Sequence, residues 1–164
     1  MDAGVGLSLE GLSVAPAASL AAAVAPVGRS LGLRAAVAVS AAREESLAPG
    51  AVRWRRWPSL QLGPQARISG ESLTAGVGAH GAVALMRIDG RGFQENHRHA
   101  RVVFGVGPDL HLGLRRAGVR PWLGAEALFF LTPVTAFEQP AGRTFALPRL
   151  QLMLTAGIGF AAGS

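Results

Sequence analysis

The four histidines of this 164-residue chain come closest to a pattern that could do chemistry. His97 and His99 are separated by one residue in the segment ENHRHA, and Glu95 stands just before them. Imidazole and carboxylate groups are common ligands of Zn²⁺, so this segment could capture a metal ion weakly. The same composition is typical of a polar, solvated loop tip, and we favour that interpretation. We therefore expect no metal site and no bound cofactor.

A second pair, His80 and His111, could include a general base if Asp109 or Glu126 lay beside one of the rings. A neighbouring carboxylate orients an imidazole and stabilises its protonated form. However, no serine of the sequence stands in a recognisable nucleophile motif, and the chain has no cysteine. Because the set of residues that a hydrolase needs is incomplete, we expect that the protein is not an enzyme.

Composition and charge narrow the possible partners. All 16 basic residues are arginines, and 10 acidic residues oppose them, which gives a net charge of +6. Nucleic-acid-binding proteins gather their basic side chains on one face or along one helix. Here most of the arginines are dispersed between apolar residues. We therefore expect no nucleic-acid partner.

The chain is unusually apolar. Apolar residues make up 49% of it and charged residues only 16%, against about 25% charged residues in average soluble domains. The longest uncharged stretch, residues 11–28, is interrupted by Pro16 and Pro26, so it does not predict a spanning helix of roughly 20 apolar residues. The first residues lack the basic start of a secretory signal peptide. The apolar excess must therefore belong to elements other than a membrane helix.

Apolar residues alternate with polar or small residues along most of the chain, which is the pattern of β-strands with two different faces. In residues 101–115, for example, the even positions from Val102 to Leu114 are apolar, and the odd positions are polar or glycine apart from Val103. We expect about eight strands, at residues 4–12, 18–26, 31–42, 52–68, 72–87, 101–115, 120–131 and 147–160. Each of these ranges reaches the roughly 9–11 residues that a tilted strand needs to cross a bilayer.

The connections between these strands alternate in length. Short turns rich in glycine and serine are expected at residues 27–30, 69–72 and 116–119, and longer polar links at residues 43–50, 88–100 and 132–146. Membrane barrels have this asymmetry, with short periplasmic turns and longer external loops. With the strand pattern and the ending LPRLQLMLTAGIGF, which places Phe160 on the apolar face, the chain resembles the small bacterial outer-membrane β-barrel proteins.

The resemblance implies one domain over residues 1–164, an all-β, up-and-down antiparallel transmembrane β-barrel of about eight strands. It implies a location in the outer membrane of a Gram-negative bacterium and a structural or surface-binding role through the longer loops. The implied partners are outer-membrane lipid, lipopolysaccharide and the barrel-insertion machinery, which would act through the C-terminal strand. The chain is expected to be a monomer.

In such a barrel the polar strand faces line the lumen. Eight strands leave an interior that side chains can fill, so we expect no open pore. We interpret the lumen side chains as a structural network of mixed sign that neutralises itself through charge-assisted hydrogen bonds. Its expected members are Glu10, Arg34, Arg67, His80, Asp109, His111, Glu126, Arg149 and Gln151, with Arg53 and Arg101 nearer the external rim.

The segment RWRRW, which consists of Arg53, Trp54, Arg55, Arg56 and Trp57, interleaves arginine and tryptophan where a strand meets an external loop. Arginine binds phosphates in a bidentate manner, and tryptophan favours the membrane interface. The segment could therefore contact lipopolysaccharide sugars or phosphates. An ordinary interfacial anchor is the simpler interpretation, and we favour it.

Two alternative functions remain open from the sequence. The first is a soluble, lipocalin-like barrel that binds a small apolar ligand, in which the apolar strand faces would point inward. The second is a barrel lipid hydrolase that uses His80 or His111. The direction in which the apolar faces point separates the first alternative from a membrane barrel.

Overall fold

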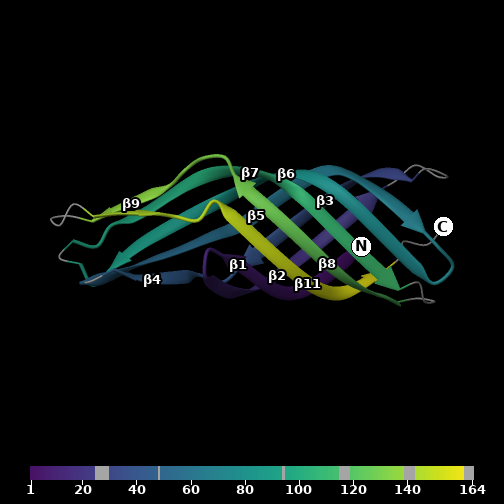
Figure 1. Ribbon diagram of the computed structural model, residues 1–164, viewed down its shortest axis with the longest axis horizontal. Coiled ribbons are helices and arrows are strands. Elements are labelled where there is room, and N and C mark those ends of the chain that lie inside the picture. Colours follow the sequence, from purple (N-terminus) through teal and green to yellow (C-terminus); the bar gives the residue numbers. More distant parts are fainter. Residues whose placement is uncertain (25–29, 48, 94, 115–118, 139–142, 161–164) are drawn as a thin grey trace.

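Eight strands close into an antiparallel barrel in the computed structural model, which confirms the predicted fold class (Figure 1). The structure describes residues 1–24, 30–47, 49–93, 95–114, 119–138 and 143–160. The barrel strands are β1 (Asp2–Glu10), β2 (Ser13–Val24), β3 (Leu31–Ser40), β5 (Gly50–Ser69), β6 (Leu73–Arg91), β7 (Arg98–Leu114), β8 (Val119–Phe130) and β11 (Leu150–Phe160). Three shorter strands, β4 (Arg43–Leu47), β9 (Thr135–Glu138) and β10 (Arg143–Ala146), lie outside this ring.

The ring follows the order of the sequence, as expected for an up-and-down barrel. Strand β1 pairs with β2 on one side and with β11 on the other, so the first and last strands are neighbours. Pairing of β3 with the second half of β5 completes the closure. Among the residues that the structure describes, no helix is long and apolar enough to cross a membrane.

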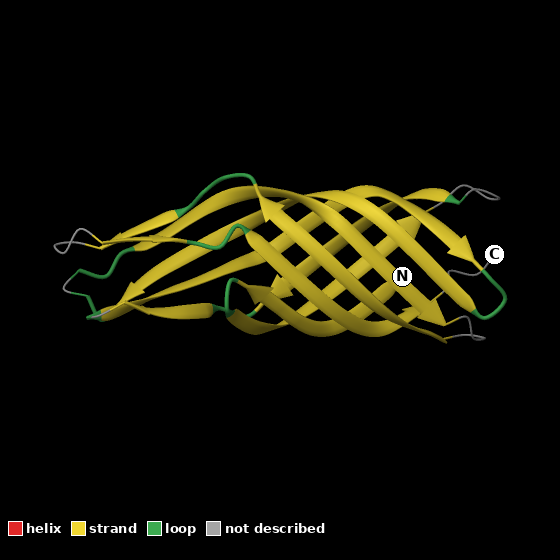
Figure 2. Ribbon diagram, viewed as in Figure 1, coloured by secondary structure: helices red, strands yellow, loops and turns green. Residues whose placement is uncertain are grey.

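The two ends of the barrel differ. Both termini lie at one end, which we call the terminal end (Figure 1). At the opposite end, which we call the extended end, β5, β6 and β7 continue beyond their shorter neighbours, β4 pairs with β5, and β9 pairs with β10 as a separate hairpin (Figure 2). The predicted polar links 43–50, 88–100 and 132–146 are thus largely paired strand rather than open loop. The expected turns at 27–30 and 116–119 lie largely outside the described residues.

The first hairpin starts earlier than the sequence pattern indicated. Strand β2 begins at Ser13, five residues before the expected start at residue 18, and only Gly11 and Leu12 separate it from β1. Gly11 has a φ of +59°, a conformation that glycine adopts at low cost and that suits two-residue hairpin turns.

The last strand, β11, begins later than the sequence pattern indicated. It starts at Leu150 rather than at Leu147, because Leu147 is buried in an apolar cluster at the extended end.

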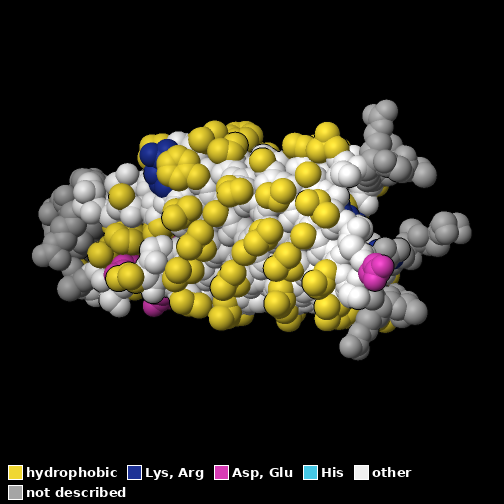
Figure 3. Space-filling view, turned by 45° about the vertical axis from the view of Figure 1, so that its right-hand side comes forward, with side chains coloured by type: hydrophobic (Ala, Val, Ile, Leu, Met, Phe, Trp, Pro, Cys, Tyr) yellow, Lys and Arg dark blue, Asp and Glu magenta, His cyan; other side chains and the backbone are white. Residues whose placement is uncertain are grey.

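Large apolar side chains cover the outside of the barrel, and we call this surface the apolar belt (Figure 3). It consists of exposed residues on the outward faces of all eight strands: Val5, Leu7, Leu9, Val14, Leu20, Leu31, Leu33, Val37, Leu60, Leu62, Ile68, Leu73, Val77, Val83, Val102, Phe104, Val106, Leu110, Leu112, Leu114, Val119, Leu123, Phe129, Leu150, Leu152, Leu154, Ile158 and Phe160. Soluble monomers rarely expose contiguous apolar patches beyond a few hundred Å². The belt therefore requires an apolar environment around the barrel.

A bulge in β5 reverses which residues point inward. The pairing between β5 and β6 shifts register between Arg56 and Ser59. On the terminal side of this shift, the odd-numbered residues Ser59, Gln61 and Gln65 are buried. On the extended side, the even-numbered residues Trp54 and Arg56 are buried instead. A β-bulge inserts an extra residue and so moves the side-chain alternation by one position.

Candidate functional site in the barrel lumen

The lumen is closed at the extended end by an apolar cluster, which we call the lid. Its buried members come from β5 to β8 and from the segments that flank the β9–β10 hairpin: Val52, Trp54, Ala82, Ala84, Met86, Val103, Leu128, Phe130, Val134 and Leu147. The hairpin is held against the barrel by Phe145, whose ring centroid lies 5.8 Å from that of Trp54. Buried aromatic and aliphatic side chains exclude water, so the lid separates the lumen from the solvent at this end.

Beside the lid lies a buried charge cluster centred on Glu10. Its carboxylate accepts hydrogen bonds from the Trp54 indole (3.0 Å) and from the Arg56 guanidinium, and it lies 3.3 Å from Nη1 of Arg43. The Glu10 and Arg43 side chains are fully buried, and that of Arg56 is only 3% exposed. Buried charges are costly unless they are paired and hydrogen-bonded. The two arginines therefore depend on Glu10 as their shared counter-ion.

Further hydrogen bonds and one ring contact tie this cluster to neighbouring segments. Arg43 donates through Nη2 to the carbonyl (2.9 Å) and to Oγ (2.7 Å) of Ser8. Gln151 also donates to Oγ of Ser8, at 2.8 Å. Arg56 donates to the carbonyl of Pro148 at 2.6 Å, and its guanidinium lies 4.1 Å from the Phe130 ring centroid. The cluster thus joins β1, β4, β5, β8 and β11 across the lumen.

A second polar cluster surrounds His80 on β6. Its Nδ1 lies 3.3 Å from Oδ1 of Asp109, and its Nε2 lies 3.7 Å from Oε1 of Glu126. Two amides of β5 complete the group, because Gln61 donates to Glu126 (2.6 Å) and Gln65 donates to Asp109 (3.4 Å). Both partners of His80 are carboxylates, and each carboxylate also accepts from a glutamine. The arrangement is a cross-linked network of paired side chains.

His80 is brought close to β5 by a glycine. Gly63 is buried beside it, and a Cβ atom at Gly63 would lie only 2.6 Å from the Cα atom of His80. Any larger residue at this position would push the two strands apart. Glycine in a strand often marks such a close approach of two backbones.

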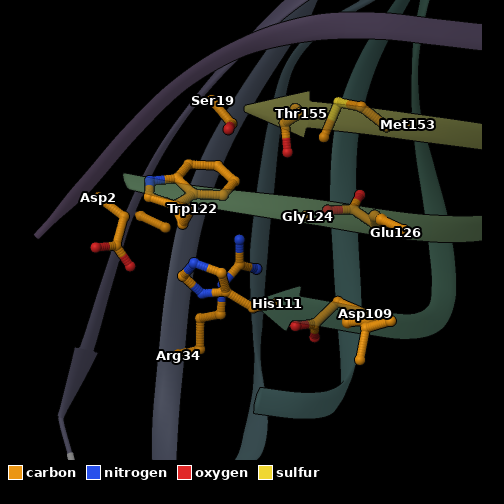
Figure 4. Close-up of a pocket in the computed structure, with 13 residues that line it drawn as sticks. Asp2, Ser19, Arg34, Asp109, His111, Trp122, Gly124, Glu126, Met153 and Thr155 are labelled. Carbon is orange, nitrogen blue, oxygen red and sulfur yellow. The ribbon is translucent and has the colours of Figure 1, made fainter. Parts of the chain in front are cut away.

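A cavity opens beyond this network, and its lining includes Asp2 near the N-terminus (Figure 4). Its volume is about 20 Å³, which is room for about one water molecule. Arg34 from β3 and His111 from β7 both extend into it, and His111 meets the Trp122 ring edge-on at a centroid distance of 4.8 Å. The indole nitrogen of Trp122 is buried and has no hydrogen-bond partner among the described residues. The cavity is therefore lined by a cation from β3 on one side of the barrel and by an imidazole and an indole from β7 and β8 on the other.

Most of the expected lumen residues do lie inside the barrel. Glu10, His80, Asp109 and Gln151 are buried, and Arg34, Arg67, His111 and Glu126 are half-buried on inward-facing positions. Arg53 and Arg149 are the exceptions. Arg53 belongs to the outward-facing phase of β5, because its neighbours Val52 and Trp54 are the buried ones, so its placement in the lumen is wrong. Arg149 also lies outside. Its side chain donates to the carbonyls of Phe130 (3.0 Å) and Leu131 (3.1 Å) and lies over the outward-facing Phe129 ring, so its placement in the lumen is wrong. Arg149 precedes β11, so the strand alternation does not fix its direction.

The side chains of the segment RWRRW point to both sides of the barrel wall, some into the interior and some to the outside. Trp54 and Arg56 are buried in the lid and in the Glu10 cluster, so their expected contact with lipid or lipopolysaccharide is wrong. Trp57 is 46% exposed on the outside, and Arg53 and Arg55 are half-buried. The cause is the bulge between Arg56 and Ser59. Pro58 was the signal for it, because proline within a strand is confined to edges and bulges.

The lumen also contains residues that are not among the predicted ones. Arg43 falls in a predicted polar link, and its inward direction has no signal in the sequence. Ser8, Gln61 and Gln65 do have one, because the alternation of β1 and β5 directs them inward. The expected polar tip at Glu95, His97 and His99 is exposed, with Nε2 of His97 lying 3.4 Å from Glu95. Within the described ranges, no group of three potential metal ligands is found. Arg101 is exposed at the rim.

The three tryptophans provide a direct test of the bulge. Trp57 faces outward, whereas Trp54 and Trp122 are 2% and 8% exposed. In vesicles that contain brominated lipid, which quenches tryptophan on contact, we expect strong quenching in a Trp54→Phe/Trp122→Phe variant and little quenching in a Trp57→Phe variant. If the Trp57→Phe variant were quenched as strongly as the wild type, the inward assignment of Trp54 would be wrong.

Comparison with known proteins agrees with this architecture. No protein-family model matches the sequence, and no curated protein matches it. Among solved structures, the chain is similar to neisserial surface protein A (NspA), with a TM-score of 0.56 and 15% identity over 96% of this chain and 91% of NspA. It is also similar to Ail, the attachment invasion locus protein of Yersinia pestis, with a TM-score of 0.52 and 14% identity over 96% of this chain and 94% of Ail. Both are small outer-membrane barrels, and this chain has the fold of the small eight-stranded outer-membrane β-barrel proteins.

Proposed function

We propose that the protein is an integral outer-membrane β-barrel with a filled lumen, and that it acts through the surface of its extended end rather than by catalysis. The apolar belt is the observation that carries this proposal, because all eight strands expose large apolar side chains on the outside of a barrel whose inside is polar. Outer-membrane barrels have this inverted arrangement, with an outward apolar band about 25 Å tall.

Different observations argue against the two alternative functions that the sequence left open. A soluble, lipocalin-like barrel needs its apolar faces inside, and the exposure of the belt contradicts it. A lipid hydrolase would need a nucleophile beside a histidine. The hydrogen-bond and ion-pair partner of His80 Nδ1 is Asp109, and Glu126 faces Nε2. We therefore assign the lumen network a structural role.

Membrane insertion can be tested with the purified chain. We expect chain unfolded in urea to fold when it is diluted into lipid vesicles, and to migrate faster on a denaturing gel before heating than after heating. In buffer without lipid or detergent the exposed belt would cause aggregation. A monodisperse, folded protein in buffer alone would contradict the proposal.

Vesicles that contain the folded protein also test whether the lumen is closed to small molecules. The lid and the two polar clusters fill the barrel, so vesicles that contain the folded protein are expected to retain an entrapped dye of a few hundred daltons as well as empty vesicles do. Leakage of the dye in proportion to the amount of folded protein would show an open pore.

A further inference from the structure

Two arginines face each other directly on the outside of the barrel, just beyond the apolar belt. Arg55 on β5 and Arg87 on β6 are cross-strand partners, and both belong to the outward-facing phase of their strands. Like charges directly opposite each other destabilise a sheet. Neither guanidinium forms an ion pair with a carboxylate in the described part of the chain. The pair therefore lacks an anion.

The two neighbouring acidic residues, Glu44 on β4 and Asp89 on β6, are cross-strand partners of Arg53 and not of Arg55 or Arg87. Glu44 is exposed and forms no ion pair in the described part of the chain. Asp89, which is the cross-strand partner of Arg53, is engaged by Nε of Arg98 at 2.7 Å. Arg53 adds a third guanidinium to the same outward face, two residues along the strand from Arg55. Arg53 thus has a carboxylate on each neighbouring strand, whereas Arg55 and Arg87 face only each other.

A cavity lies between these side chains. Its volume is about 220 Å³, and it is lined by Ala42, Arg53, Trp54, Arg55, Arg87 and Asp89. The guanidinium of Arg55 lies 5.1 Å from the ring centroid of Trp57, which holds it beside the edge of the belt. Arginine forms bidentate hydrogen bonds with phosphate, so three guanidiniums around one cavity suit a phosphate group.

The position of the cavity along the barrel axis indicates which molecule would carry such a phosphate. On β5 the outward face runs through Leu62 and Leu60 to Trp57 and then to Arg55. On β6 it runs from Val83 to Leu85 and then to Arg87. Apolar side chains give way to arginine at the same level on both strands. In a bilayer this is the boundary at which lipid headgroups lie and tryptophan is enriched.

We propose that Arg53, Arg55 and Arg87 bind a phosphate group on the headgroup of an outer-leaflet glycolipid. This inference rests on the proposed membrane location, and it deepens that proposal by naming the site and the chemical group. It also replaces the site that the segment RWRRW suggested, because Arg87 enters the site while Trp54 and Arg56 contribute their side chains to the interior.

Binding of a bisphosphorylated lipid A to the full chain, folded in detergent micelles, tests the proposal. We expect the Arg55→Ala/Arg87→Ala variant to bind this lipid on the order of tenfold more weakly, because two charge-assisted contacts are lost. Binding of the same lipid without its phosphates should not change. Arg55→Lys/Arg87→Lys should bind with intermediate affinity, because lysine keeps the charge but lacks the planar fork.

The matched control is Arg91→Ala/Arg120→Ala, which removes the same charge from exposed or half-buried positions outside the cavity. Its affinity should equal that of the wild type. Equal losses in the two double variants, or no loss in Arg55→Ala/Arg87→Ala, would overturn the proposal. Inorganic phosphate that bound the site as tightly as the lipid would overturn the lipid source. Each variant is first checked for heat-modifiable migration, so that failure of the barrel to form is distinguished from failure of this site.

Discussion

Replacing Glu10 by alanine is expected to lower the free energy of unfolding by about 3–5 kcal/mol, the cost of removing one partner from a buried ion pair. Glu10 is the carboxylate that faces both Arg43 and Arg56, and all three side chains are buried. Without it, two positive charges stay inside the barrel with no counter-ion. Urea titration of the protein in lipid vesicles, followed by tryptophan fluorescence, measures the change.

Two further variants show whether charge is the cause. In the background of Glu10→Ala, the change Arg56→Met should restore part of the lost stability, because it removes one uncompensated charge and fills a similar volume. The exposed pair between Asp89 and Arg98 provides the matched control, and Asp89→Ala should cost less than about 1 kcal/mol. A loss for Glu10→Ala as small as that of Asp89→Ala would contradict the role of Glu10.

Replacing Leu154 by arginine is expected to lower the free energy of unfolding in a bilayer by about 2–4 kcal/mol, the cost of an arginine at the membrane midplane. Leu154 lies near the middle of β11 and is 65% exposed. An exposed leucine of a soluble protein tolerates this change, so the size of the effect reports on the surroundings of the belt. Unfolding in lipid vesicles provides the measurement.

A substitution nearer the membrane interface provides the control for this second prediction. Leu150 belongs to the same outward face of β11, at the edge of the belt nearest the extended end. Leu150→Arg should cost only about 0–1 kcal/mol, because the cost of a lipid-facing arginine falls toward the interfaces. Equal, small effects at the two positions would mean that water, rather than lipid, surrounds the belt.

The sequence was sufficient to predict the barrel because the signal for it is local. Each strand carries its own two-residue alternation, so the outward and inward faces of β7 follow from residues 101–115 without knowledge of their neighbours. The same alternation placed Glu10, His80, Asp109 and Gln151 inside, where the structure has them.

The errors arose where the alternation is interrupted or absent. The bulge between Arg56 and Ser59 moves Trp54 and Arg56 from the outside to the inside. Arg149 stands before its strand, so its direction is set by two carbonyls and by the Phe129 ring.

The partners within the lumen could not be predicted either. Glu10 meets Arg43 and Arg56, which are 33 and 46 residues away in sequence, only because the closed barrel brings β1, β4 and β5 around one interior. The pairing of Arg55 with Arg87 depends in the same way on the register between β5 and β6.

Fractionation of cells that express the full-length gene product, combined with gel migration before and after heating, tests the membrane account most directly. We expect recovery in the outer-membrane fraction, release by detergent, and faster migration of the unheated sample. Recovery of folded protein in the aqueous fraction without detergent would contradict the membrane account, because the apolar belt would then face water.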